Sequence, residues 1–161
     1  MPPRAAAGEE AAAASLNNLA AVLYDQGDLA AARTLFERAL QIREARLGPD
    51  HPDTAQTLNG LANVLADQGD LAAARRLHER ALTVLETRLG GDHPDTAYVM
   101  NNLALVLAAQ GDLAGARPLV ERALAIREAR LGPDHSDTAR SRQDLETLVA
   151  RLKERPQSGV Q

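Results

Sequence analysis

QGDLAAARTLFERAL, residues 26–40, decides the fold, because it returns almost unchanged at residues 68–82 and 110–124. The second occurrence reads QGDLAAARRLHERAL and the third reads QGDLAGARPLVERAL, so successive copies are 42 residues apart. A repeat of this kind is typical of arrays in which each copy is one small structural unit. Such a unit cannot bury its apolar face alone, and stacking on neighbouring copies supplies the missing contact.

Each copy extends to both sides of this stretch. Residues 14–55 and 56–97 are identical at 30 of 42 positions, and residues 98–139 form the third copy. Two apolar sets in the first copy have the i, i+3, i+4, i+7 spacing of helices with one inner face. They are Leu16, Leu19, Ala20 and Leu23, followed by Ala32, Leu35, Phe36, Ala39 and Leu40.

The connections carry residues that end and begin helices. Gly27 suits the left-handed position just past a helix end, and Asp28 suits the N-cap of the next helix. Because this connection is short, the two helices of a copy should pack antiparallel. Gly48-Pro49 should end the second helix, and Pro52 stands where the next helix begins, a place that tolerates proline.

The composition indicates an all-α fold. Apolar residues make up 45% of the chain, most of them Ala and Leu, whereas aromatic residues make up only 2%. Ala and Leu favour helices, and the β-branched and aromatic residues that favour strands are scarce. We therefore expect three helix pairs and a C-terminal capping helix, about seven helices in all.

Charge and composition also exclude several function classes. The net charge of −4 comes from acidic and basic residues that are mixed along the chain, which argues against a nucleic-acid partner. No apolar run or polybasic patch indicates a membrane, and the N-terminal residues lack the apolar core of a secretion signal. The chain has no cysteine and hence no thiol chemistry. We expect a cytoplasmic protein without a cofactor.

The ends of the chain differ from the repeats. Residues 1–9 are expected to be disordered or frayed, and residues 10–155 to form a single solenoid domain. A largely polar helix over about residues 137–155 should cover the last repeat, with Leu145, Leu148 and Leu152 on its inner side. Residues 156–161, which include Pro156 and Gly159, are expected to be a disordered tail.

The wording of the copies resembles a known family. The phrases are Leu-Asn-Asn-Leu-Ala at 16–20, Gln-Gly-Asp at 26–28, Glu-Arg-Ala-Leu at 37–40 and Leu-Gly-Pro-Asp-His-Pro-Asp-Thr-Ala at 47–55. They are similar to the long tetratricopeptide repeats of kinesin light chains and their bacterial relatives. The resemblance implies a right-handed superhelix whose first-type helices line a concave groove that holds peptide segments of partner proteins.

The resemblance assigns a set of polar and aromatic residues to that groove. They are Asn17, Asn18, Tyr24, Asn59, Asn63, Tyr98, Asn101, Asn102 and Arg140. An asparagine amide both donates and accepts, which suits an extended peptide backbone. The periodic asparagines could instead brace neighbouring helices, and the two tyrosines could pack against a helix neighbour. The basic cluster with which chaperone-binding relatives hold a C-terminal carboxylate is missing.

The remaining motifs favour structural roles. His51, His93 and His135 occur once per copy, so they cannot converge on one metal ion, and we expect them to order the return loops. His78 occupies the position of Phe36 and should be a half-buried packing residue. Nothing resembles a catalytic constellation, so the sequence predicts that the protein is not an enzyme.

These observations favour a scaffold that binds a partner protein or peptide. Three alternatives stay open. The chain could be a structural or self-assembling module that associates weakly with itself through its uncapped N-terminal end. It could be a fragment of a larger multidomain protein, or an engineered array close to a consensus sequence.

Overall fold

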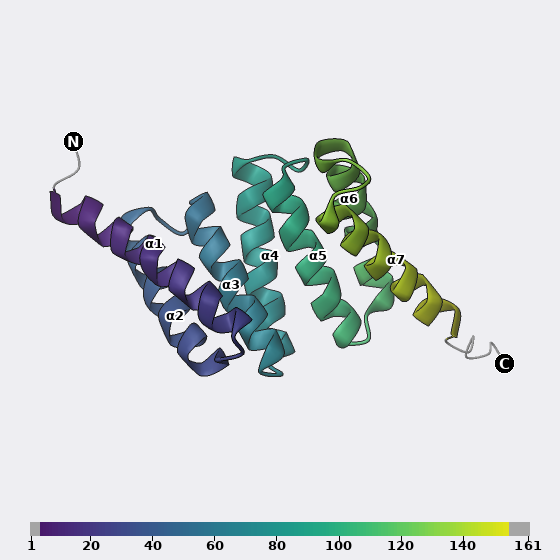
Figure 1. Ribbon diagram of the computed structural model, residues 1–161, viewed down its shortest axis with the longest axis horizontal. Helices are drawn as coiled ribbons and strands as arrows, with labels where there is room; N and C mark the ends of the chain where they lie inside the picture. The colour runs from purple at the N-terminus through teal and green to yellow at the C-terminus, as the bar shows by residue number, and fades with distance from the viewer. Residues whose placement is uncertain (1–3, 155–161) are drawn as a thin grey trace. The chain divides into compact units, whose positions relative to one another are not determined.

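The structure is a computed structural model that describes residues 4–154, all of whose regular elements are α-helices (Figure 1). Seven helices lie in this range: α1 (Arg4–Asp25), α2 (Leu29–Arg46), α3 (Pro52–Asp67), α4 (Leu71–Arg88), α5 (Pro94–Ala109), α6 (Leu113–Leu131) and α7 (Ser136–Glu154). The predicted all-α repeat fold is therefore confirmed. The chain divides into two compact units, residues 1–89 and 90–161. Each unit is described by itself, and a single domain over residues 10–155 stays a prediction.

The short turn inside each helix pair has the predicted chemistry. Gly27, Gly69 and Gly111 have φ values of 83°, 89° and 86°, a conformation that glycine adopts without steric cost. The aspartate that follows caps the next helix: the Asp28 carboxylate accepts a hydrogen bond of 3.1 Å from the Ala31 amide. The same cap recurs at Asp70 and Asp112. Since the turn reverses the chain, α1 packs on α2, α3 on α4, and α5 on α6.

The return loops are held by residues that recur with the repeat. The His51 ring accepts a hydrogen bond of 3.1 Å from the Asp53 amide through Nδ1, and His93 and His135 do the same. The Thr54 hydroxyl donates to the Gly48 carbonyl at 2.9 Å. The expectation that these histidines order the loops is confirmed. Among residues 4–154, no group of His, Asp and Glu side chains could hold a metal ion.

Small residues let the helices of the first unit approach closely. Ala20, Ala32, Ala39 and Ala62 are fully buried, and small side chains at a crossing permit short interaxial distances. Gly60 is the tightest point, because a Cβ added there would lie 2.5 Å from Cε1 of Phe36. Phe36 of α2 therefore packs directly against the backbone of α3.

In the second unit, α6 packs on both α5 and α7 (Figure 1). Ala104, Ala116 and Ala123 occupy the buried small-residue positions, and Leu148 of α7 is also buried. The predicted capping helix is present with bounds one residue earlier at each end, Ser136 and Glu154. Leu145 and Leu152 on its inner side are half-buried.

Two expectations about the N-terminal region differ from the structure. The segment expected to be frayed over residues 1–9 is helical from Arg4 onward. In it, Glu9 forms an ion pair with Arg46, and Glu10 lies 3.4 Å from Nε of Arg43. Leu19, expected on the inner face of its helix, is 51% exposed. Residues 1–3 and the tail expected at 156–161 lie outside the described residues.

Membrane insertion has no support among the described helices. None of the helices within residues 4–154 has both the length and the apolar character needed to cross a membrane.

Candidate functional site

The nine residues assigned to the groove differ widely in exposure. Three are exposed, namely Asn18, Tyr98 and Arg140. Four are half-buried, namely Asn17, Tyr24, Asn63 and Asn102. Two are buried, namely Asn59 and Asn101. The periodic asparagine at 17, 59 and 101 is thus less accessible than its neighbour one residue later in the first and third copies.

In the first unit, Asn17 is part of a polar chain that joins three helices. Its Oδ1 accepts a hydrogen bond of 3.0 Å from the Thr57 hydroxyl of α3. The Arg43 guanidinium of α2 donates to the same hydroxyl and to the Asp53 carbonyl, both at 2.8 Å. Arg43 and Thr57 are buried, so these hydrogen bonds satisfy groups that water cannot reach.

The second unit repeats this chain with one addition. The Ser141 hydroxyl of α7 donates to Oδ1 of Asn101 at 3.0 Å, and the Arg127 guanidinium of α6 donates to Ser141 at 2.6 Å. The Asn101 amide also donates to Asp144 at 2.8 Å. Arg127 lies 6.0 Å from the ring centroid of Tyr98, a distance suited to a cation–π contact. Burial lowers the pKa of the Arg127 guanidinium, while the nearby Asp137 acts in the opposite direction.

The two chains show what the asparagines at 17 and 101 do. Each amide oxygen is held by a hydroxyl of the following first-type helix, and Asn101 is only 2% exposed. These two side chains brace neighbouring helices, which was the alternative interpretation of the sequence. Leu85 of copy two occupies the position of Arg43, and Val99 of copy three occupies the position of Thr57; both are buried. The arginine and its hydroxyl partner are therefore replaced together by apolar residues.

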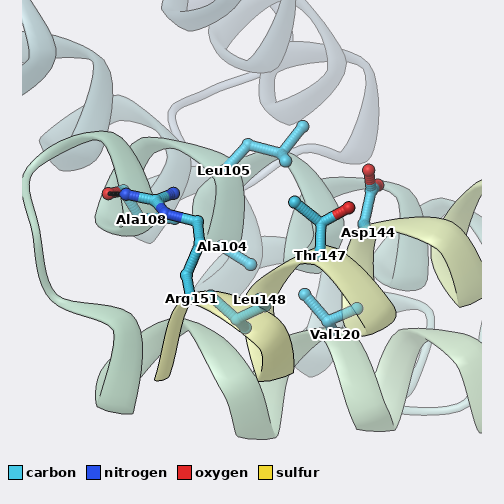
Figure 2. A pocket seen from close by; sticks show the side chains of 8 residues that line it. All are labelled: Ala104, Leu105, Ala108, Val120, Asp144, Thr147, Leu148 and Arg151. Carbon is cyan, nitrogen blue, oxygen red and sulfur yellow. Dashed lines mark hydrogen bonds between the residues drawn. The ribbon is translucent and has the colours of Figure 1, made fainter. Parts of the chain in front are cut away.

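A pocket opens on the surface that α5, α6 and α7 share in the second unit (Figure 2). It is lined by Ala104, Leu105, Ala108, Val120, Asp144, Thr147, Leu148 and Arg151. The cavity volume is about 60 Å³, less than half of the ~150 Å³ that holds a benzene molecule in an apolar protein cavity. One short aliphatic side chain fits such a space.

Two residues that line the pocket are smaller than their counterparts in the first copy. Val120 occupies the position of Phe36, whose ring in the first unit reaches the backbone at Gly60. Ala108 likewise occupies the position of Tyr24. Where the first copy has two aromatic rings, the third has a valine and an alanine, and Asp144 stands at the position of Gly60.

The rim of the pocket holds two opposite charges in fixed places. The Asp144 carboxylate accepts from Asn101, and the Arg151 guanidinium donates to the Ala108 carbonyl at 3.3 Å. In Figure 2, Asp144 and Arg151 lie at opposite ends of the lining. They are about two turns of α7 apart, with Thr147 on the turn between them. Leu105 of α5 beside the pocket is 39% exposed.

Sequence reasoning missed parts of this surface. Arg151 was not among the residues assigned to the groove, and the pocket depends on residue sizes that a helical wheel does not register. The buried Arg43 and Arg127 were also missed. The sequence did contain a sign of these buried arginines. Arg43 and Arg127 are each followed 14 residues later by a hydroxyl residue, Thr57 or Ser141. Leu85, at the same repeat position, is followed at that spacing by Val99.

His78 is more buried than the sequence predicted. It is fully buried, and within residues 4–154 neither ring nitrogen has a hydrogen-bond partner. Burial lowers the pKa of His78 to about 4, because a low-dielectric environment disfavours the charged imidazolium. The ring is therefore a neutral packing group at physiological pH.

Comparison with solved structures shows similar repeat folds. The nearly identical TPR-like repeats of a protein from Podosopora anserina, assigned as a kinesin light chain, align with a TM-score of 0.75 and 23% identity, covering 89% of this chain and 76% of that one. BtubC (BKLC) from P. vanneervenii gives a TM-score of 0.68 and 19% identity, covering 92% and 67%. SycD, a type III secretion translocator chaperone from Yersinia enterocolitica, gives 0.65 and 17%, covering 86% and 84%. The comparison with curated proteins finds no match.

A family model gives the assignment at the level of sequence. The tetratricopeptide repeat model matches three overlapping segments, residues 11–87, 57–129 and 95–158. Together they cover all three copies and the capping helix. Since the family model matches residues 11–158 and the motifs and capped helix hairpins of the described residues agree with it, this chain belongs to the tetratricopeptide repeat family.

Proposed function

We propose that the protein is an interaction scaffold that binds a peptide segment of a partner protein on the surface formed by α5 and α7. The observation that carries this proposal is the apolar pocket between two anchored charges in the second unit. Ligand sites are typically concave and apolar, with a few fixed polar groups that set orientation. The structural neighbours include a chaperone, which supports a general role in protein interaction.

The chemistry of the surface defines the kind of peptide. A short aliphatic side chain such as valine would enter the pocket between Leu105 and Leu148. A basic group on one side of it would meet Asp144, and an acidic or carbonyl group on the other side would meet Arg151. Tyr98 of α5 offers an exposed ring for a further contact, since tyrosine is common at binding hot spots.

The groove asparagines divide into two roles under this proposal. Asn17 and Asn101 hold the helices in register, whereas the more accessible Asn102 of α5 would contact the peptide in the second unit. Arg140 is an exposed cation on α7, one turn before Asp144, and would meet an acidic or carbonyl group of the peptide beyond the basic group held by Asp144. An extended peptide would use these amides as both donors and acceptors for its backbone.

The test is a selection of peptides from a random display library on the wild-type protein, followed by binding measurements on two variants. Thr147→Trp places a large ring at the mouth of the pocket, and Thr147 is exposed, so the core is unaffected. Glu146→Trp is the matched control, because Glu146 is also exposed on α7 but does not line the pocket. Selected peptides should bind the Thr147→Trp variant at least about tenfold more weakly than the wild type, a loss of ~1.4 kcal/mol. They should bind the Glu146→Trp variant with the affinity of the wild type.

Two outcomes contradict the proposal. One is that no peptide is enriched over a library selected on an unrelated helical protein. The other is that enriched peptides bind the Thr147→Trp variant as tightly as the wild type. Far-UV circular dichroism of both variants checks that the helices are intact.

A further inference from the structure

One side of α1 is an uncharged stripe that faces away from the rest of its unit. It consists of Gly8, Ala11, Ala12, Ser15, Leu19 and Val22, all of which are exposed. At 100° per residue these six positions fall within about 100° of one another. The stripe is about 21 Å long at 1.5 Å per residue. Leu19 and Val22 are 51% and 50% exposed, a large exposure for aliphatic side chains next to each other.

The same positions are covered in other first-type helices. Thr57 of α3 is the counterpart of Ser15, and it is buried under Arg43 of α2. Leu61 and Val64, the counterparts of Leu19 and Val22, are 6% and 0% exposed. In the second unit, Ser141 of α7 is buried under Arg127 of α6 in the same way. This side of a first-type helix is therefore built to pack against another helix.

We propose that two copies of this chain pair through α1, antiparallel across a two-fold axis at Ser15. The side chains of the stripe are large at its C-terminal end, where Leu19 and Val22 lie, and small at its N-terminal end. Ser15 is at the middle of the stripe. An antiparallel partner centred there places Val22 opposite Gly8 of the second copy and Leu19 opposite Ala11 of the second copy. A two-fold interface needs such a self-complementary surface, in which each contact occurs twice. Small residues opposite large ones also let the two helices approach closely.

The polar chemistry of the stripe is compatible with burial. Its one polar side chain, Ser15, already donates its hydroxyl to the Ala11 carbonyl at 3.0 Å, so pairing leaves no unsatisfied donor. No charged side chain lies on it. These features favour a second copy over a partner helix with charged residues, and the half-exposed Leu19 and Val22 of each copy would be covered by the small residues of the other copy.

The size of the surface sets the expected affinity. A contact between two single helices lies below the ~1,200 Å² that separates standard interfaces from weak ones. We therefore expect a dissociation constant on the order of 100 μM at neutral pH. The pairing does not depend on the proposed peptide site, because every residue of the pocket lies in the second unit.

Cysteine cross-linking tests the geometry directly, because the chain has no cysteine of its own. Ser15→Cys places two thiols at the two-fold axis, within the ~4.4–6.8 Å Cα separation that a disulfide spans. Ala21→Cys is the matched control, since Ala21 is exposed on another side of the same helix. With oxidised glutathione as the oxidant, Ser15→Cys should form covalent dimers roughly tenfold faster than Ala21→Cys, because pairing raises the local thiol concentration. Equal rates would overturn the proposal.

Sedimentation equilibrium of the cysteine-free chain gives the second test. The wild type should show a monomer–dimer equilibrium, and the double variant Leu19→Glu/Val22→Glu should stay monomeric. Both positions are exposed, so the variant should keep its helices, which circular dichroism checks. A wild type that stays monomeric up to about ten times the expected dissociation constant, on the order of 1 mM, would refute the pairing, as would a double variant that dimerises equally well.

Discussion

Acidification should destabilise this protein through His78, and the substitution His78→Val should remove much of that effect. The ring is fully buried and its nitrogens have no hydrogen-bond partner within residues 4–154. Burial moves the pKa of His78 from 6.5 to about 4. Valine is the natural comparison, because the third copy has Val120 at the same position.

The direction of this pH effect on stability follows from which state of the chain binds the proton. Below pH 6.5 the unfolded chain protonates this histidine, whereas the folded chain does not until the pH reaches about 4. The unfolded state therefore gains free energy as the pH falls through this window. The contribution of His78 to stability is fully present above pH 6.5, and it is lost between pH 6.5 and about 4. At ~1.4 kcal/mol for each pH unit that separates the two pKa values, the loss is ~3 kcal/mol.

Urea unfolding at a series of pH values between 7 and 4 measures this loss, with far-UV circular dichroism as the signal and linear extrapolation to water. The wild type should lose ~3 kcal/mol more than the His78→Val variant over this range. The variant starts from a lower stability because valine leaves a cavity, but only the difference in slope matters. Every other residue is the same in both proteins, so the comparison isolates the effect of position 78. Two parallel curves would refute the reasoning.

Two further predictions concern packing inside the first unit. Thr57→Val alone should cost ~1–3 kcal/mol, because it leaves Arg43 and Asn17 without a hydroxyl partner. The double variant Arg43→Leu/Thr57→Val installs the apolar residues found one repeat later, Leu85 and Val99. It should cost less than the sum of its single variants in the same urea assay, and additive costs would contradict the coupling. Gly60→Ala should cost ~1–3 kcal/mol, because the added Cβ meets the Phe36 ring, and the cost should fall in a Phe36→Val background; an unchanged unfolding midpoint would rule out the tight contact.

The sequence predicted those features of the fold that depend on local chemistry. Gly27 and Asp28 ended one helix and capped the next as expected, because a left-handed glycine and an N-cap carboxylate act on their own backbone neighbourhood. The histidines of the return loops acted in the same way. The helix pairs could be predicted from the spacing of small and aliphatic residues, because this spacing is a property of each helix alone.

The features that depend on a neighbouring helix were harder to predict. Leu19 has the spacing of an inner residue, but its exposure depends on whether another helix covers that side of α1. Asn101 lies on the side of α5 expected to be open, yet a hydroxyl and a carboxylate of α7 hold its amide. Arg127 is long enough to bury its guanidinium against α7, which its position on a wheel does not reveal.

Differences between the copies are the most informative guide to function in this chain. Positions that are alike in every copy build the stack, since each has the same neighbours. Departures change what a neighbouring helix meets: Val120, in place of Phe36, lines a pocket, and the exchange of Thr57 for Val99 accompanies the loss of a buried arginine. If a partner recognises this protein, its selectivity should depend on such departures, because a surface that repeats identically offers no unique register to a bound peptide.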